Sequence, residues 1–191
     1  MKLDVISLKN FYDNPYEVRE MALKLDYNVT GNFPGGRTKP YLSKSVKNSI
    51  EQIVYPYGGK ITKFNEEYNG AFQITYSWDK SWIHADNHNT WAAVCYLTPN
   101  APSSAGTGFF KHRKTGMMKP INGKTILDKK IESEGQENFK WEMIQSVSNE
   151  FNKIVVYDSK LYHSSLDYFG DTLQNGRLFQ VFFFDTERSN R

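Results

Sequence analysis

From about residue 70 onward, the apolar residues of this chain occur in short runs rich in β-branched and aromatic side chains. Turn-forming stretches, such as TPNAPSSAG at 98–106 and DTLQNG at 171–176, separate these runs. The runs span residues 71–78, 81–85, 91–98, 106–112, 152–158 and 176–185. Short strands that follow one another without intervening helices pack as antiparallel layers. The pattern therefore predicts a mainly β fold, a sandwich or jelly roll.

Residues 1–65 differ from this β-rich part, because their apolar residues recur at helical spacing. One helix is expected to begin after Asp13 or Asn14, with Pro15 near its first position. A second is expected to begin after Ser43 and to end at Pro56 and the glycines that follow it. These helices would support a β core at 70–185.

A polar, lysine-rich segment at 113–140 interrupts the β-rich part. Its length and composition predict a long insertion, either a lid over a site or a solvated loop. The chain shows no internal repeat, and its 191 residues are expected to form a single domain, 1–191.

Bulk properties exclude some partners. The formal net charge of +3 does not indicate a nucleic-acid partner. No apolar run approaches the roughly 20 residues that a membrane span requires. The N-terminus lacks the apolar core of a signal peptide, so a cytoplasmic location is expected.

Two of the four histidines lie in one stretch, SWIHADNHNT at 81–90. Residues two apart on a strand point to the same face, so His84 and Asp86 would present an imidazole and a carboxylate side by side. A second histidine from elsewhere would complete the two-histidine, one-carboxylate set of non-haem Fe(II) oxygenases. His88, between Asn87 and Asn89, fits a turn beside this motif better than a metal ligand.

The C-terminal third offers two further residues for such a site. His163 follows the β-rich run 152–158, and Arg177 stands at the head of the apolar run 176–185. A guanidinium that points into an apolar interior is costly unless it meets an anion, and its fork suits a carboxylate.

In this order and context, H-A-D at 84–86, His163 and Arg177 in GRLFQVFFF resemble the 2-oxoglutarate- and Fe(II)-dependent oxygenases, in particular their prolyl-hydroxylase-like branch. The resemblance implies a double-stranded β-helix over about 70–185, with Fe(II) bound by His84, Asp86 and His163. It implies that Arg177 binds the distal carboxylate of 2-oxoglutarate and that Tyr76 donates a hydrogen bond to this cosubstrate. The implied activity is a dioxygenase reaction with O2, most often hydroxylation.

Two positions depart from the family's pattern. Phe179 stands where many relatives carry a hydroxyl residue, two positions after the arginine. The segment SAGTGFF at 104–110 replaces a frequent acidic Gly-Gly turn. Both departures concern how 2-oxoglutarate and the substrate are held.

The substrate is not specified by these motifs, and a small molecule or a peptidyl side chain would both fit. Candidate binding residues are Arg37 in the glycine-rich loop FPGGR, His88 at the site entrance, and Trp91. One of Trp78, Trp82 and Trp91, which flank the H-A-D motif, is expected to form a wall of the cleft. Two alternatives stay open on the residues alone. One is a cupin-like jelly-roll metalloenzyme that does not use 2-oxoglutarate, and the other is a non-catalytic β-sandwich binding module.

Overall fold

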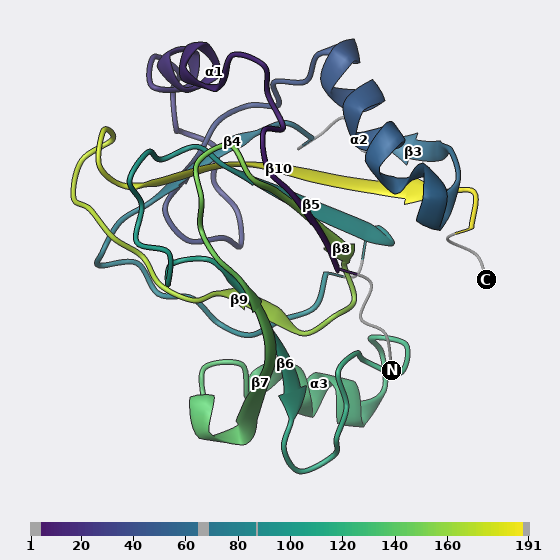
Figure 1. Cartoon of the computed structure of the whole chain (residues 1–191). Coiled ribbons are helices and arrows are strands. Elements are labelled where there is room, and N and C mark those ends of the chain that lie inside the picture. The colour runs from purple at the N-terminus through teal and green to yellow at the C-terminus, as the bar shows by residue number, and fades with distance from the viewer. Residues whose placement is uncertain (1–4, 65–68, 87, 189–191) are drawn as a thin grey trace.

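The computed structural model describes residues 5–64, 69–86 and 88–188, which form two antiparallel sheets and their supporting helices (Figure 1). The larger sheet has the order β1-β8-β5-β10-β4-β2, with β3 also paired to β10, and the smaller has the order β7-β6-β9. The larger sheet consists of β1 (Val5–Leu8), β2 (Gly36–Arg37), β3 (Ile61–Phe64), β4 (Phe72–Thr75), β5 (Trp91–Tyr96), β8 (Ile154–Asp158) and β10 (Arg177–Thr186). The smaller consists of β6 (Thr107–His112), β7 (Trp141–Val147) and β9 (His163–Ser165). The predicted jelly-roll class is confirmed.

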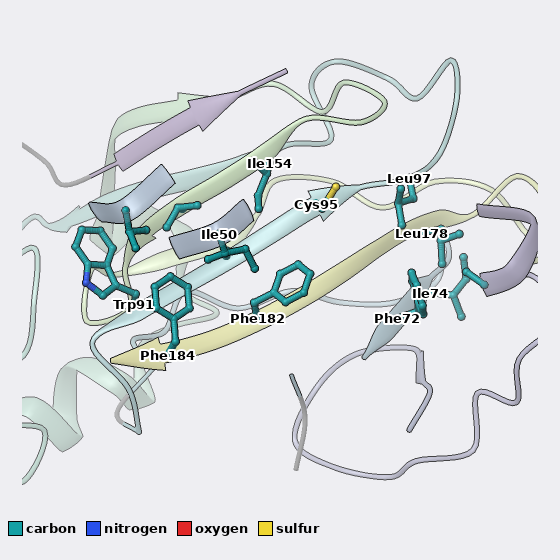
Figure 2. Close-up of a cluster of buried hydrophobic side chains, with 14 residues drawn as sticks. Ile50, Phe72, Ile74, Trp91, Cys95, Leu97, Ile154, Leu178, Phe182 and Phe184 are labelled. Carbon is teal, nitrogen blue, oxygen red and sulfur yellow. The ribbon is translucent and has the colours of Figure 1, made fainter. Parts of the chain in front are cut away.

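One face of the larger sheet packs against the two N-terminal helices, α1 (Pro15–Ala22) and α2 (Lys44–Gly58). Phe182 and Phe184 of β10 and Cys95 of β5 lie with Ile50 of α2 in one buried cluster (Figure 2). The helices thus cover the apolar outer face of this sheet, as the helical pattern of the first third predicts.

The opposite face of the same strands points toward the smaller sheet. Tyr96 of β5, Tyr157 of β8 and Phe179 of β10 form a second buried cluster with Phe109 of β6. Because successive side chains of a strand point to opposite faces, each strand contributes to both layers. The interior between the two sheets contains the cavity described below.

Both predicted N-terminal helices are present, and α1 begins at Pro15 after its N-cap Asn14 as expected. Ser43 caps α2 by accepting a hydrogen bond from the Val46 amide at 3.2 Å. This helix ends at Gly58, with Gly59 at φ 79° as its C-cap, which agrees with the predicted end at Pro56 and the glycines that follow it. Pro56 removes only its own amide donor, and the helix ends two residues later. None of the helices in the described ranges is long and apolar enough to cross a membrane.

Five of the six predicted runs contain a strand, and the run at 81–85 does not. In that run, His84 forms a single bridge to His163. Another correction concerns the absence of helices between strands, since α3 (Ile126–Ser133) and the 3-10 turn η1 (Asn138–Lys140) lie between β6 and β7. The long β-rich runs can be predicted because their composition is distinctive. Short strands such as β2 form only because a partner strand is present, so the sequence does not indicate them.

The insertion at 113–140 contains helix α3, which packs against neighbouring elements, so the segment is not a solvated loop; its role as a lid stays a prediction. Ile131 of α3 is buried against Ile83 and Trp141. The Ile83 amide donates to the Gly135 carbonyl at 2.9 Å, so the insertion contacts the segment that carries His84. None of the described residues between 113 and 140 lines the cavity between the sheets. The insertion therefore packs against the residues next to His84.

Asp128 organises the start of α3, and its removal is expected to destabilise the insertion. Its carboxylate accepts hydrogen bonds from the amides of Ile121, Asn122 and Thr125, at 2.8, 3.3 and 3.2 Å. Burial raises the pKa of Asp128, but these hydrogen bonds outweigh that effect and lower the pKa to about 2. The stabilisation is therefore present above about pH 4 and is lost as the pH falls toward 2.

Asp128→Ala is expected to lower the free energy of unfolding by about 1–2 kcal/mol, because it leaves backbone donors without partners. Urea titration and hydrogen exchange of the amides between residues 121 and 133 measure this effect. Glu132→Ala, which removes an exposed carboxylate from the same helix, is the matched control. Equal destabilisation by both variants would contradict the capping role.

Candidate functional site

The backbone brings His84 and His163 directly opposite each other. The His84 amide donates to the His163 carbonyl at 3.0 Å, and the His163 amide donates back to the His84 carbonyl at 2.8 Å. Two residues further, the Asp86 amide donates to the Ser159 carbonyl at 2.9 Å. Opposed residues in an antiparallel pair point to the same side, and so do residues two apart. The three side chains therefore converge.

Both imidazoles are held in the same tautomer. Nδ1 of His84 lies 3.0 Å from the Trp82 carbonyl, and Nδ1 of His163 lies 2.7 Å from the Leu161 carbonyl. A carbonyl oxygen only accepts hydrogen bonds, so each Nδ1 carries the proton and each Nε2 presents a lone pair. Hydrogen bonds of this kind orient the histidine ligands of metal sites.

The two Nε2 atoms face the Asp86 carboxylate. Nε2 of His84 lies 3.8 Å from Oδ1, and Nε2 of His163 lies 3.5 Å from Oδ2. Burial and the neighbouring His84 lower the pKa of His163 to about 4, although the Asp86 charge opposes this shift. At neutral pH, Nε2 of His163 therefore presents a lone pair, and not a proton, to the Asp86 carboxylate. Such an arrangement is stabilised by a cation, and metal–ligand bonds of about 2.1 Å allow one ion to reach atoms at these separations.

Arg177, the first residue of β10, is 1 % exposed and points into the same interior. Its Nε donates to the Ala105 carbonyl at 3.0 Å, and Nη2 donates to the Gly106 carbonyl at 3.4 Å. Nη1 is buried without a hydrogen-bond partner among the described residues. Burial lowers the pKa of this guanidinium. A buried cation with an orphaned donor favours an anionic ligand.

Aromatic rings surround this guanidinium. It lies 4.5 Å from the centroid of Phe179, 5.4 Å from that of Tyr96 and 5.8 Å from that of Tyr168. Phe179 thus stacks on the arginine at the position where the resembling family often has a hydroxyl residue. The rings fix the orientation of the guanidinium while leaving its charge unneutralised.

A cavity of about 180 Å³ connects these groups. His84, Asp86 and His163 line it together with both predicted arginines, Arg37 and Arg177. Arg37 belongs to β2, and its Nε donates to the Gln73 side-chain oxygen at 3.0 Å. Burial lowers the pKa of Arg37 to about 10, while the Asp86 charge acts in the opposite direction.

Three of the predicted site residues lie elsewhere, as corrections. Tyr76, just after β4, packs against the helix-backed cluster, as do Phe72 and Ile74, and its ring stacks on that of Trp78. Trp91 is buried in the same cluster, where its Nε1 donates to Thr186 Oγ1 at 3.2 Å (Figure 2). His88 is exposed and does not line the cavity.

Other residues also line the cavity. Trp82, one of the three tryptophans expected beside the H-A-D motif, has its ring centroid 5.7 Å from that of His84. Sequence reasoning missed Tyr157 and Gln73. Tyr157 lies 4.8 Å from the His163 ring, and Gln73 faces inward beside Arg37. No local pattern marks Tyr157 or Gln73, since strand pairing brings them to the site.

Comparison with solved structures identifies the fold. HygX from Streptomyces hygroscopicus, in a crystal structure with nickel and 2-oxoglutarate bound, superposes with a TM-score of 0.65 at 12 % identity, covering 97 % of this chain and 84 % of that chain. A prolyl hydroxylase from Trichoplax adhaerens, in complex with a hypoxia inducible factor peptide fragment, superposes with a TM-score of 0.60 at 12 % identity, covering 98 % and 86 %. At this identity the likeness establishes the fold, which is the double-stranded β-helix of the 2-oxoglutarate oxygenases.

At the level of sequence, no curated protein matches this chain. The sequence model of one family matches residues 2–184, nearly the whole chain. The chain therefore belongs to DUF6445, a family of unknown function.

Proposed function

We propose that this chain is an Fe(II)- and 2-oxoglutarate-dependent oxygenase, and specifically a hydroxylase of a substrate C–H bond. One observation carries the proposal: the convergent lone pairs of His84, Asp86 and His163 share a cavity with the orphaned guanidinium of Arg177. The fold supports it, because HygX with the same fold has been crystallised with iron and with 2-oxoglutarate.

The donor set fits Fe(II). Two neutral imidazoles and one carboxylate form the facial set of non-haem iron oxygenases and leave coordination positions open for other ligands. Nε2 of His84, Nε2 of His163 and the Asp86 carboxylate would hold the ion. When bound, Fe(II), 2-oxoglutarate and O2 supply the oxidative decarboxylation of the cosubstrate to succinate and CO2 and the oxidation of a substrate C–H bond.

Arg177 fits the distal carboxylate of 2-oxoglutarate. Its Nη1 lacks a partner among the described residues, and the surrounding rings keep water away from the charge. A charge-assisted hydrogen bond to a carboxylate would satisfy both the donor and the charge. The buried aromatic walls, including Tyr157, also exclude water from the reacting groups.

The proposal is tested without knowledge of the substrate. Anaerobic addition of Fe(II) and then 2-oxoglutarate to the purified protein is expected to produce the visible charge-transfer band of a bidentate 2-oxo acid chelate. Tight metal binding with no band would favour a jelly-roll metalloenzyme that does not use 2-oxoglutarate. Absence of both the band and metal binding would favour a binding module.

A further inference from the structure

We propose that the substrate oxidised at this site carries one carboxylate, which Arg37 binds at the cavity. This inference rests on the proposed function, since it assigns the substrate of the same site. It concerns Arg37 and its surroundings, which the iron and 2-oxoglutarate sites do not use.

The backbone of the FPGGR loop holds Arg37 in place. Gly35 has φ +70°, and a Cβ atom there would lie 2.0 Å from the Ile74 carbonyl oxygen. The loop backbone therefore lies directly on β4, an approach that only glycine allows. Arg37 pairs in register with Gln73 of β4, and Gln73 pairs with Phe179 of β10. These three side chains form one row across the sheet on the face of the cavity.

The contacts of Arg37 orient the guanidinium but leave its charge unneutralised. Nε and Nη2 both donate to the neutral Gln73 Oε1. The Gln73 side-chain amide in turn donates to the Pro34 carbonyl at 2.7 Å, so both ends of the glutamine are engaged. The Phe33 ring lies 3.7 Å from the guanidinium carbon. Among the described residues, no carboxylate forms an ion pair with Arg37, and Nη1 makes no hydrogen bond.

The charges of the loaded cavity leave an excess of one positive charge. Fe(II) and 2-oxoglutarate carry opposite charges of equal size, Asp86 carries one negative charge, and Arg37 and Arg177 carry one positive charge each. His84 and His163 are neutral as metal ligands. Arg37 is half-buried in the cavity, where an anionic ligand beside it would offset this excess. A carboxylate has one charge and two oxygens that suit a guanidinium.

The walls beside Arg37 indicate what the carboxylate is attached to. Phe33 and Trp82 both line the cavity, Phe33 against the Arg37 guanidinium and Trp82 with its ring centroid 5.7 Å from that of His84. An apolar or aromatic body next to the acid group would contact these rings. Phenylacetate is therefore a suitable probe, and phenylacetamide is its neutral counterpart of the same shape.

The test uses protein loaded with Zn(II) and N-oxalylglycine, an unreactive isostere of 2-oxoglutarate. Formation of this complex is established first, so that a failure of the proposed function appears at that step. Phenylacetate is then titrated while the Arg37 Nε–H resonance is followed by NMR, with Arg37→Gln identifying the signal. A saturable shift with phenylacetate in the millimolar range, and none with phenylacetamide, is expected.

Trp fluorescence provides the affinity of phenylacetate for each variant, because Trp82 lines the cavity. Arg37→Gln is expected to weaken binding by roughly tenfold or more, since it removes charge-assisted hydrogen bonds. Arg37→Lys should retain part of the affinity, which separates loss of charge from loss of folding. Lys39→Gln removes an exposed positive charge just beyond β2 and should leave binding unchanged.

Three results would overturn the inference while leaving the proposed function intact. The first is equal binding, or no saturable binding, of phenylacetate and phenylacetamide. The second is an equal effect of Arg37→Gln and Lys39→Gln. The third is tighter binding of phenyl phosphate than of phenylacetate, which would assign the site to a phosphate group.

Discussion

Asp86→Ala is expected to abolish Fe(II) binding and the charge-transfer band. The carboxylate is the only negatively charged ligand of the trio, and it lies between the two histidine nitrogens. Replacing groups that merely orient a ligand costs about 10–100-fold in metal affinity, so loss of the ligand itself should exceed about 100-fold. Anaerobic calorimetry with Fe(II) measures the change.

The metal-free protein provides a second readout for this variant. Asp86 is 27 % exposed at its side chain and faces lone pairs, so its removal should leave the melting temperature of the metal-free protein nearly unchanged. Addition of Fe(II) should raise the melting temperature of the wild type but not that of Asp86→Ala. Asp79→Ala, which removes a carboxylate from the preceding turn, is the control and should bind Fe(II) normally. Normal Fe(II) affinity in Asp86→Ala would exclude this metal site.

Arg177→Met is expected to weaken 2-oxoglutarate binding strongly while leaving Fe(II) binding intact. Loss of one partner of a buried charge pair costs about 2–5 kcal/mol, which corresponds to a rise in Kd of roughly 30-fold or more. At a 2-oxoglutarate concentration of about 100 times Kd, binding should raise the free energy of unfolding of the wild type by about 2.7 kcal/mol. For a domain of this size, that is an increase in Tm of roughly 5–10 °C.

Arg19→Met separates a specific effect on 2-oxoglutarate from general destabilisation. Arg19 is also buried, but its guanidinium is engaged: Nη1 donates to the Leu97 carbonyl and Nη2 to the Gln174 carbonyl. The Arg19 variant should therefore melt at a lower temperature and yet retain the shift produced by 2-oxoglutarate. If Arg177→Met retained that shift as well, the cosubstrate would have to be anchored by another residue.

Much of the site follows from local periodicity. The alternation of side chains along an extended segment is a property of the backbone, and it holds even where His84 forms only one bridge in place of a strand. Alternation alone does not tell which of the two faces of an extended segment points to the cavity. The positions predicted for Tyr76 and Trp91 are therefore wrong, since both side chains lie in the helix-backed layer.

The two faces of the larger sheet show why the layer was ambiguous. Both faces are buried, one by the helices and one by the smaller sheet, so hydrophobicity does not distinguish them. Helix α3 was missed for a related reason. With eight residues it is too short to be stable alone, so it needs contacts such as that of Ile131 with Trp141.

The sequence alone predicts the order of the strand-forming runs, the H-A-D spacing and the candidates His163 and Arg177. Each of these features depends on neighbouring residues or on a short motif. Only the tertiary structure shows that His163 lies opposite His84 and which carbonyls set both tautomers. It alone also shows the row of Arg37, Gln73 and Phe179. These features join residues far apart in sequence, through a strand register that cooperative packing of the whole fold selects.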